Sequence, residues 1–320
     1  MVDSFGRTIE YMRISITDRC NLRCRYCMPA GTEGVHCEEI LSYEEIARAV
    51  KAAAQCGIKY IKITGGEPLV RRDAEKLVSM IKETEGIEAV TMTTNGVLLQ
   101  DKAQALKDAG LDAVNISIDT LERERYKEIT GFDCLENVLE GIDEAIRVGL
   151  RVKINAVVLE KNIDECVSLI KMAEDRPVDV RFIEMMPLGE GRNFEAISCD
   201  EVKKRIERVY PDFKSVDYSG GYGPAEYYRI DGFKGNIGFI NAVHNVFCEN
   251  CNRIRLTSSG FIKACLCYDE GENIREPLRE GRDGEVKNII ERVIGNKPLR
   301  HCFDDADKVS EIHDMFEIGG

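Results

Sequence analysis

The stretch Arg13–Cys27 reads RISITDRCNLRCRYC, and it joins an expected β-strand to a group of three cysteines. Cys20, Cys24 and Cys27 are separated by three and then by two residues. Three thiolates at this spacing can bind three irons of a [4Fe–4S] cluster and leave the fourth iron open to a small molecule. A zinc site with Cys37 as fourth ligand is the alternative, although zinc sites usually contain two complete Cys-x2–4-Cys pairs.

The composition is that of a globular protein. The chain of 320 residues is long enough for one large domain and a smaller one. We expect neither a signal peptide nor a membrane span, and therefore a cytoplasmic protein. Its thirteen cysteines should not form disulfides, and those that cluster are expected to bind metal. The net charge of −13 argues against nucleic-acid binding, which needs a basic surface.

Short β-branched runs alternate with helical patterns over residues 10–184, and this alternation favours βα units around a parallel sheet. Helix starts are expected at the N-cap residues Ser42, Asp133, Asn162 and Ser198. The expected strands are Arg13–Ile16, Ile58–Thr64, Ala89–Thr94, Ala113–Ile118, Val152–Val157 and Val178–Ile183.

Polar side chains occupy alternate positions in five of these strands, so each strand carries a polar row on one face. The rows are Arg13, Ser15 and Thr17; Lys62 and Thr64; Thr91 and Thr93; Asn115, Ser117 and Asp119; Lys153 and Asn155. A half-exposed sheet is one explanation. We favour an α/β fold with an incomplete parallel (β/α)6 barrel, a partial TIM barrel, whose interior is a polar cavity. Sites in such folds lie at the C-terminal ends of the strands, where the first cysteine group is expected.

The pattern changes after residue 210. The run SGGYGP at residues 219–224 is typical of a hinge or linker, and the βα rhythm is lost beyond it. We therefore predict a barrel domain over residues 1–210. A smaller α+β domain over residues 211–320 would close the barrel opening.

A second cysteine group, Cys248, Cys251 and Cys265, lies in the predicted C-terminal domain. Its spacing allows a zinc site with Cys267 or His244 as fourth ligand. The spacing equally allows a second iron–sulfur cluster with one open iron.

Arg253 and Arg255 alternate on an extended run, so both guanidinium groups face one side and can donate to phosphate. With Arg13, Lys62 and Lys153 from the polar rows, they predict several cations converging on one cavity. Burying cations without an anion is costly, so this set predicts a polyphosphate ligand.

Several motifs carry a specific resemblance. Tyr11–Asn21, the Thr64–Pro68 run TGGEP and the CENCNRIRLT run from Cys248 resemble radical S-adenosylmethionine (SAM) enzymes, and among them the GTP 3′,8-cyclase family. The resemblance covers nearly the whole chain, and it implies SAM and two [4Fe–4S] clusters as cofactors. The implied cluster ligands are Cys20, Cys24 and Cys27 for the first cluster, and Cys248, Cys251 and Cys265 for the second.

The resemblance also implies the ligand contacts. SAM contacts are expected from Tyr26, Gly66, Glu67, Ser117 and Met186, with Glu67 accepting from the SAM amino group. GTP contacts are expected from Arg13, Lys62, Thr93, Lys153, Arg253 and Arg255. On the residues alone, ordinary packing would explain Tyr26 and Met186. We name no general acid or base.

The implied reaction is a lyase-type cyclisation of GTP. One electron would cleave SAM to methionine and a 5′-deoxyadenosyl radical, which would remove the ribose 3′ hydrogen before C3′ attacks C8 of guanine. The product would be (8S)-3′,8-cyclo-7,8-dihydroguanosine 5′-triphosphate, made in the first step toward molybdopterin. Implied partners are a flavodoxin- or ferredoxin-like reductant protein and the downstream cyclic pyranopterin monophosphate synthase, and the chain could form a homodimer.

The end of the chain is part of the resemblance. A terminal Gly-Gly enters the active site in this family, which predicts the same for Gly319 and Gly320. Two positions depart from the family pattern, namely Asn241-Ala242 in place of Ser-Pro, and Phe316 in place of a small polar residue. The alternatives are a peptide-modifying radical SAM enzyme with an auxiliary cluster and a non-catalytic zinc-binding adaptor.

Overall fold

The computed structural model describes residues 1–28, 35–218, 221–244 and 247–319. Residues 219–220 of the expected hinge and the terminal Gly320 lie outside the described residues. No helix in the described part of the chain combines the length and the apolar character that a membrane span requires.

One sheet of twelve strands organises the molecule, and its eight central strands are parallel. In spatial order these are β10 (Arg253–Leu256), β1 (Tyr11–Ser15), β2 (Tyr60–Thr64), β3 (Ala89–Thr94), β4 (Ala113–Ser117), β5 (Arg151–Val158), β6 (Val178–Glu184) and β9 (Ile237–Ile240). Antiparallel strands extend both ends: β11 (Phe261–Lys263) and β12 (Gly271–Asn273) beside β10, and β8 (Glu226–Arg229) and β7 (Lys214–Val216) beside β9. The terminal strands β12 and β7 leave the sheet open, which confirms an incomplete barrel.

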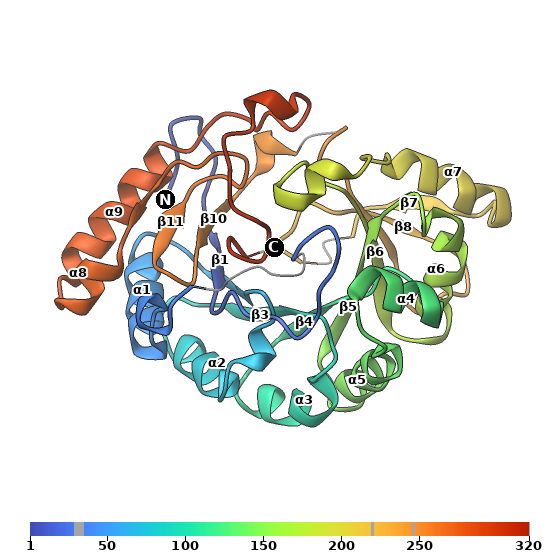
Figure 1. The fold of residues 1–320 in the computed structure, drawn as a ribbon, viewed down its shortest axis with the longest axis horizontal. Coiled ribbons are helices and arrows are strands. Elements are labelled where there is room, and N and C mark those ends of the chain that lie inside the picture. The colour runs from blue at the N-terminus through green and yellow to red at the C-terminus, as the bar shows by residue number, and fades with distance from the viewer. Residues whose placement is uncertain (29–34, 219–220, 245–246, 320) are drawn as a thin grey trace.

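Helices surround the curved sheet on its outer side (Figure 1). They are α1 (Tyr43–Gln55), α2 (Ala74–Lys82), α3 (Leu99–Asp108), α4 (Arg123–Thr130), α5 (Leu135–Arg147), α6 (Cys166–Asp175), α7 (Cys199–Val209), α8 (Arg275–Arg279) and α9 (Asp283–Gly295). The aliphatic positions of the strands, such as Ile14, Ile63 and Met92, are fully buried in the main hydrophobic core. The alternate, polar positions therefore face the barrel interior, as the sequence predicts.

Two of the expected helix starts are confirmed. Ser42 caps α1 in a complete capping box, because its hydroxyl accepts from the Glu45 amide while the Glu45 carboxylate accepts from the Ser42 amide. Ser198 caps α7 by accepting from the Asp200 amide.

At the other two positions a helical segment begins within two residues, but the expected side chain does not cap it. Helix α5 begins after Cys134, which makes no side-chain cap, and Asp133 instead binds Arg123. Helix α6 begins only at Cys166. Asn162 precedes a short 3-10 turn and uses its side chain to bridge Leu159 and Asp119. In both cases a tertiary partner outcompetes the local cap.

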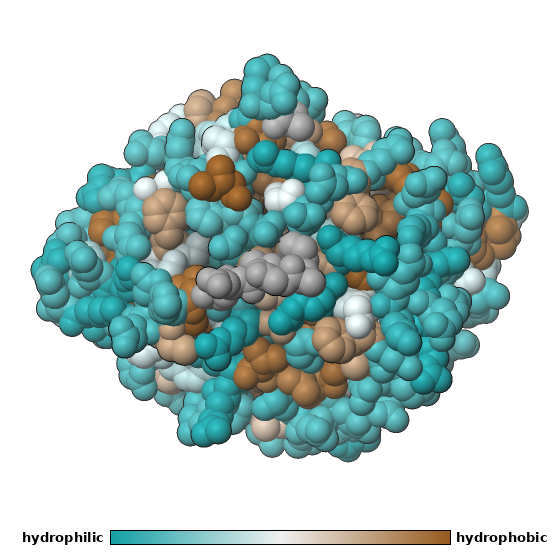
Figure 2. Space-filling view, in the orientation of Figure 1, coloured by the Kyte–Doolittle hydropathy of each residue, from teal (hydrophilic) through white to brown (hydrophobic). Residues whose placement is uncertain are grey.

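The chain after residue 210 does not form a separate layer. Strands β7–β9 continue the sheet beside β6, whereas β10–β12 continue it beside β1. The division into domains at residue 210 therefore stays a prediction. The C-terminal segment turns into the middle of the ring of helices (Figure 1), on a face that is mainly hydrophilic (Figure 2).

Candidate functional site

Cations gather inside the barrel because neighbouring strands bring them into register. Arg255 on β10 pairs with Arg13 on β1, which in turn pairs with Lys62 on β2. Lys153 on β5 and Arg181 on β6 lie further along the same curved surface. Paired residues of adjacent strands point to the same face, so these cations share one interior.

All of these cations except Arg13 are almost completely buried. Lys62, Lys153 and Arg255 are each at most 8% exposed. Burial holds the pKa of Lys62 well below its usual range, and the positive charges of Arg181 and Arg13 add to this effect. Burial and Arg181 likewise lower the pKa of Lys153 to about 8. A set of buried like charges is stabilised by an anion, so the interior suits a polyphosphate.

The polar rows predicted from the sequence do not include Arg181, a further interior cation. It is 6% exposed, and its guanidinium Nη2 donates to Asn155 Oδ1 at 2.6 Å. Its neighbour in register is Gly238, where a Cβ atom would lie 2.8 Å from Arg181 Cγ, so glycine leaves the space that the arginine occupies. Asp179 and Arg181 alternate on β6, and extending the search for polar rows to this strand would have identified Arg181.

The N-terminal cysteine loop follows the C-terminal end of β1. Cys24 anchors a turn in which its carbonyl accepts from the Cys27 amide at 3.0 Å. The Cys20 thiol accepts from Asn95 Nδ2 at 3.7 Å, which ties the loop to the end of β3. Burial raises the pKa of Cys24, and the neighbouring Cys27 and Cys20 thiols raise it further. The three free thiols therefore lie close enough to influence one another, which fits a shared metal centre.

The TGGEP run packs directly against this loop. A Cβ atom on Gly65 would lie 2.5 Å from the Thr17 carbonyl oxygen, and one on Gly66 would lie 2.5 Å from that of Arg19. Only glycine permits this close approach of two backbones. The predicted SAM contact at Gly66 thus lies beside the cysteine loop.

Glu67 is buried, at 1% exposed, and its carboxylate joins two loops. It accepts hydrogen bonds from the Leu69 amide, the Thr94 hydroxyl and the Asn95 amide at 2.6 to 2.9 Å. Burial raises its pKa from 4.5 to about 7 despite these donors. The side chain therefore has a clear structural role, and its contact with the SAM amino group stays a prediction.

The other predicted SAM contacts lie on strand ends or loops. Tyr26 in the cysteine loop donates its hydroxyl to Asp119 Oδ2 at 2.6 Å. Ser117 is the last residue of β4, and Met186 follows β6. Thr93, a predicted GTP contact, lies on the interior face of β3 opposite Asn115.

The second cysteine group is assembled by strand pairing. Cys251 precedes β10, and the antiparallel pairing of β10 with β11 brings the chain back so that Cys265 lies near Cys248 and Cys251. Burial raises the pKa of Cys248, although a hydrogen bond from the His301 amide lowers it. The Cys265 and Cys251 thiols raise this pKa further. The strand pairing therefore brings the three thiols into one region, close enough to influence one another.

Cys251 lies in a more positive environment. Burial alone would raise its pKa, but the charges of Arg253 and Lys297 overcome burial and lower the pKa to about 7. Lys297 Nζ also donates to the carbonyl oxygens of Arg253 and Ala264, which fixes it beside the thiols. A thiolate favoured by cations is ready to bind a metal at neutral pH.

The two candidates for a fourth ligand have other partners in the structure. The Cys267 sulfur lies 3.2 Å from that of Cys302, and His244 Nδ1 lies 3.1 Å from Glu184 Oε1.

The C-terminal tail enters the barrel. Arg255 Nη1 donates to the Gly319 carbonyl oxygen at 2.8 Å. A Cβ atom on Gly319, whose φ is +75°, would lie 3.0 Å from Thr64 Cγ2 and 3.2 Å from Ser15 Cβ. Gly319 thus lies where the sequence analysis predicts. Phe316, which departs from the family pattern, is 2% exposed, and its amide donates toward the Cys27 thiol.

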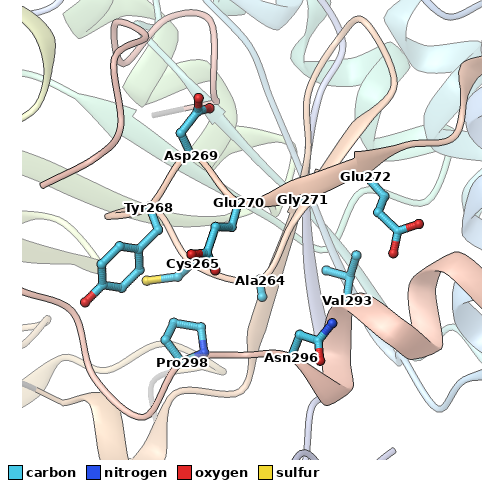
Figure 3. Close-up of a pocket in the computed structure, with 10 residues that line it drawn as sticks. All are labelled: Ala264, Cys265, Tyr268, Asp269, Glu270, Gly271, Glu272, Val293, Asn296 and Pro298. Atoms are coloured by element: carbon cyan, nitrogen blue, oxygen red, sulfur yellow. The ribbon is translucent and has the colours of Figure 1, made fainter.

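A separate pocket of about 330 Å³ lies near β12 and the end of α9 (Figure 3). Cys265 lies in its wall, but so do the carboxylates of Asp269, Glu270 and Glu272. These acidic groups would repel a triphosphate, so the cation-lined barrel is the better candidate for the substrate site.

The fold and the cysteine loop define a radical SAM protein. Residues 14–173 match the family described as the Radical SAM superfamily, and residues 178–303 match Molybdenum Cofactor Synthesis C. Among solved structures, Streptococcus suis SuiB bound to S-adenosylmethionine superimposes with a TM-score of 0.66 at 15% identity, covering 88% of this chain and 68% of that chain. Native anSMEcpe with bound AdoMet gives 0.57 at 17% identity, covering 86% and 82%. At these identities the likeness concerns the fold alone.

Curated relatives identify the particular family. GTP 3′,8-cyclase of Clostridium perfringens (strain 13 / Type A) is 45% identical over 326 residues, with 100% of both chains covered. GTP 3′,8-cyclase of Peptoclostridium acidaminophilum is 45% identical over 330 residues, covering 100% of this chain and 98% of the relative. The chain therefore belongs to the GTP 3′,8-cyclase family.

Proposed function

We propose that this protein is a radical SAM enzyme that cyclises GTP to (8S)-3′,8-cyclo-7,8-dihydroguanosine 5′-triphosphate, the first step of molybdenum cofactor biosynthesis. One observation carries the proposal: the two cysteine triads lie at opposite ends of one cation-lined strand pair. Cys251 precedes β10 and Cys20 follows β1, and these strands are parallel neighbours. Five residues at about 3.3 Å each separate the two ends by roughly 15 Å, a span that a nucleoside triphosphate can fill.

Both triads fit a [4Fe–4S] cluster. Each offers three free thiols that are partly or fully desolvated and electrostatically linked, and a metal cluster supplies the positive charge that their thiolates need. With three cysteines per cluster, one iron remains for a small molecule. The N-terminal cluster supplies the electron that cleaves SAM when both are bound.

The interior cations hold the triphosphate in this proposal. Arg255, Arg13 and Lys62 form a continuous row across three strands, and guanidinium groups donate to phosphate in a planar fork. Lys153 and Arg181 approach from β5 and β6. We assign Arg181 to this set because its charge acts on both Lys62 and Lys153. Arg253 and Thr93 complete the proposed GTP contacts.

SAM is placed against the cysteine loop. Gly66 lets its backbone lie close to the cysteine loop, and the Glu67 carboxylate would accept a hydrogen bond from the amino group of SAM. Tyr26, Ser117 and Met186 line the same ends of the strands. Tight binding positions the substrate and excludes water from reactive intermediates.

The proposed partners follow from this reaction. The enzyme would take its electron from a flavodoxin- or ferredoxin-like protein and pass its product to cyclic pyranopterin monophosphate synthase. We place it in the cytoplasm, where those proteins would be accessible.

An anaerobic assay tests the function. Reconstituted, reduced protein is mixed with SAM, with or without GTP, and 5′-deoxyadenosine and cyclised GTP are counted. GTP should raise 5′-deoxyadenosine formation and be consumed. Stoichiometric zinc without iron in the purified protein would contradict the proposal.

A peptide-modifying enzyme is the second candidate, since SuiB, solved with its precursor peptide SuiA, shares the fold at a TM-score of 0.66. In that case a peptide would raise 5′-deoxyadenosine formation and GTP would not. The interior row of cations favours GTP.

A further inference from the structure

The tail over residues 309–319 connects distant parts of the barrel. Arg192, in the turn Gly189–Asn193 after β6, donates to the Glu311 carbonyl oxygen at 2.8 Å. The Glu311 amide donates to the Cys267 carbonyl oxygen at 3.2 Å, on the segment after β11. The tail therefore spans from the β6 side of the sheet to the β11 side before Gly319 reaches Arg255.

A buried ion pair fixes the middle of this tail. The side chains of Lys263 on β11 and Glu311 form a salt bridge and are 1% and 0% exposed. Lys263 is the neighbour of Arg255 in register, so it extends the interior row of cations by one strand. The tail thus neutralises the charge of Lys263 through a carboxylate, whereas it meets Arg255 only through the neutral Gly319 carbonyl.

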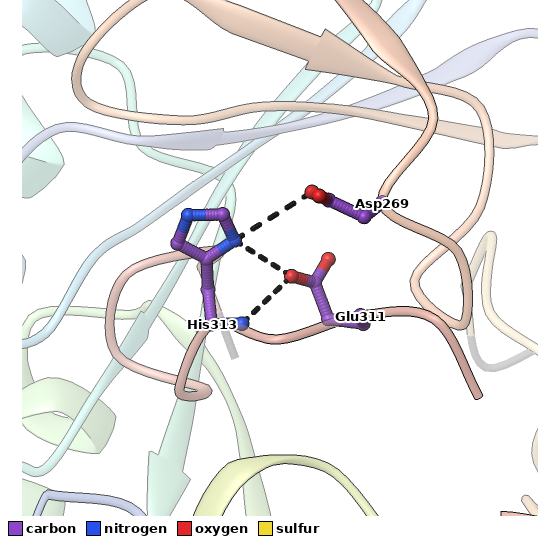
Figure 4. A group of neighbouring side chains, drawn as sticks. All are labelled: Asp269, Glu311 and His313. Carbon is purple, nitrogen blue, oxygen red and sulfur yellow. Dashed lines mark hydrogen bonds and ion pairs between the residues drawn. The ribbon is translucent and has the colours of Figure 1, made fainter. Parts of the chain in front are cut away.

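The same carboxylate organises the next residues. Glu311 Oε1 accepts from the His313 amide at 2.9 Å and lies 2.8 Å from His313 Nδ1, and Asp269 lies 3.7 Å from that nitrogen (Figure 4). The three side chains resemble a metal site. However, Lys263 already neutralises Glu311, and its ammonium group would oppose a divalent cation.

We propose that Glu311 and Lys263 are positioning residues for GTP cyclisation: their buried ion pair holds the C-terminal tail so that the Gly319 carbonyl meets Arg255 inside the barrel. This inference rests on the proposed function. Removing one partner leaves the other charge buried and unpaired, and the tail then leaves its place.

Hydrogen exchange in the reconstituted protein, without SAM or GTP, tests the anchor. In Glu311→Gln, the tail amides of residues 309–319 should exchange about tenfold faster, while those of β2–β5 keep their wild-type rates. Unchanged tail exchange would overturn the proposal. So would equal acceleration of the tail and the central strands, because that result indicates general destabilisation.

The matched control is Asp304→Asn. Asp304 pairs with Arg300 in the same region, but both side chains are more than half exposed, so tail exchange should stay at the wild-type rate. If Glu311→Gln does not fold, Glu311→Asp decides. It keeps the charge but shortens the reach, and unaltered tail exchange in that variant would also refute the anchor.

Kinetics give a second readout. Glu311→Gln should raise the KM for GTP about tenfold while SAM cleavage without GTP keeps its rate. Replacing both partners, as Lys263→Met with Glu311→Leu, removes the charges without leaving either unpaired and should restore much of the GTP affinity. If wild-type protein does not cyclise GTP, the proposed function fails, but the exchange result still decides whether this pair anchors the tail.

Discussion

The two cysteine triads have the same number of ligands, but one thiol of each, Cys27 and Cys251, differs sharply in its electrostatic surroundings. At the N-terminal triad, burial, the neighbouring Cys20 thiol and the acidic groups Asp314 and Asp119 raise the pKa of Cys27 to about 12. Around the C-terminal triad, Arg253 and Lys297 lower that of Cys251 to about 7. SAM carries a sulfonium cation, whereas GTP is an anion. We infer that the surrounding charges direct the two ligands to opposite ends of the barrel.

The largest effect should come from removing one ligand of either triad. Cys24→Ala and Cys251→Ala should each lose about half of the roughly eight irons, and both should lose all cyclisation. The two variants should differ in their ability to cleave SAM without cyclising GTP. Cys24→Ala should lose SAM cleavage, whereas Cys251→Ala should cleave SAM without stimulation by GTP. Iron analysis and 5′-deoxyadenosine counts distinguish the two.

The control is Cys134→Ala, since Cys134 lies outside both triads. It should retain iron and activity. If Cys251→Ala retains as much iron as the wild-type protein, Cys251 is not a cluster ligand, and the proposed second cluster site is contradicted.

The next effect concerns the cations between the triads. Arg255→Ala and Arg181→Ala should each weaken GTP binding by about 100-fold, equivalent to about 2.7 kcal/mol, because each removes a buried cation from the triphosphate. Binding of SAM should change little. Equilibrium binding of both ligands measures the contrast, with the exposed Arg300→Ala as control. Equal loss of both affinities would argue against separate sites.

Thiol reactivity tests the charge difference directly. In metal-free protein at pH 8, Cys251 should be alkylated about 50-fold faster than Cys27, because its larger thiolate fraction outweighs its lower intrinsic nucleophilicity. Timed alkylation followed by peptide mass spectrometry gives both rates. In Lys297→Met the Cys251 rate should fall, whereas the Cys27 rate should not. Similar rates for the two thiols in wild-type protein would contradict the electrostatic contrast.

The smallest effect is a pH dependence near the N-terminal triad. Burial raises the folded-state pKa of Glu67 from 4.5 to about 7, so the folded state favours the protonated form. This contribution to stability is complete below pH 4.5 and is lost as the pH rises to about 7. In Glu67→Gln, the part of the fall in Tm between pH 4.5 and 7 that this carboxylate causes should be lost, on the order of 2–4 °C.

Thermal unfolding at several pH values measures this dependence. The exposed Glu85→Gln should retain the wild-type profile. An unaltered profile in Glu67→Gln would exclude titration of this carboxylate as the cause.

Much of the barrel could be predicted because its signals are local. Alternation within one strand shows which residues share a face, and it is sufficient to assign Arg13, Lys62 and Lys153 to the interior. Both cysteine triads are also visible as short motifs.

The features that could not be predicted from the sequence depend on pairing between distant segments. Lys263 belongs to the interior row only because β11 pairs with β10, and Lys297, just after α9, acts on Cys251 across the fold. Local periodicity does not reveal which strands become neighbours, and it does not reveal that Asp133 binds Arg123 rather than capping a helix.

The position of the C-terminal strands in the sheet has a consequence for how the protein folds during its own synthesis. Strand β10 covers β1 and β9 covers β6, so both edges of the six-stranded N-terminal sheet stay bare while the nascent chain emerges from the ribosome. Cys265 and the tail are made later still. Assembly of the second iron centre would therefore wait until most of the chain is made, and a truncated product would expose two strand edges prone to aggregation.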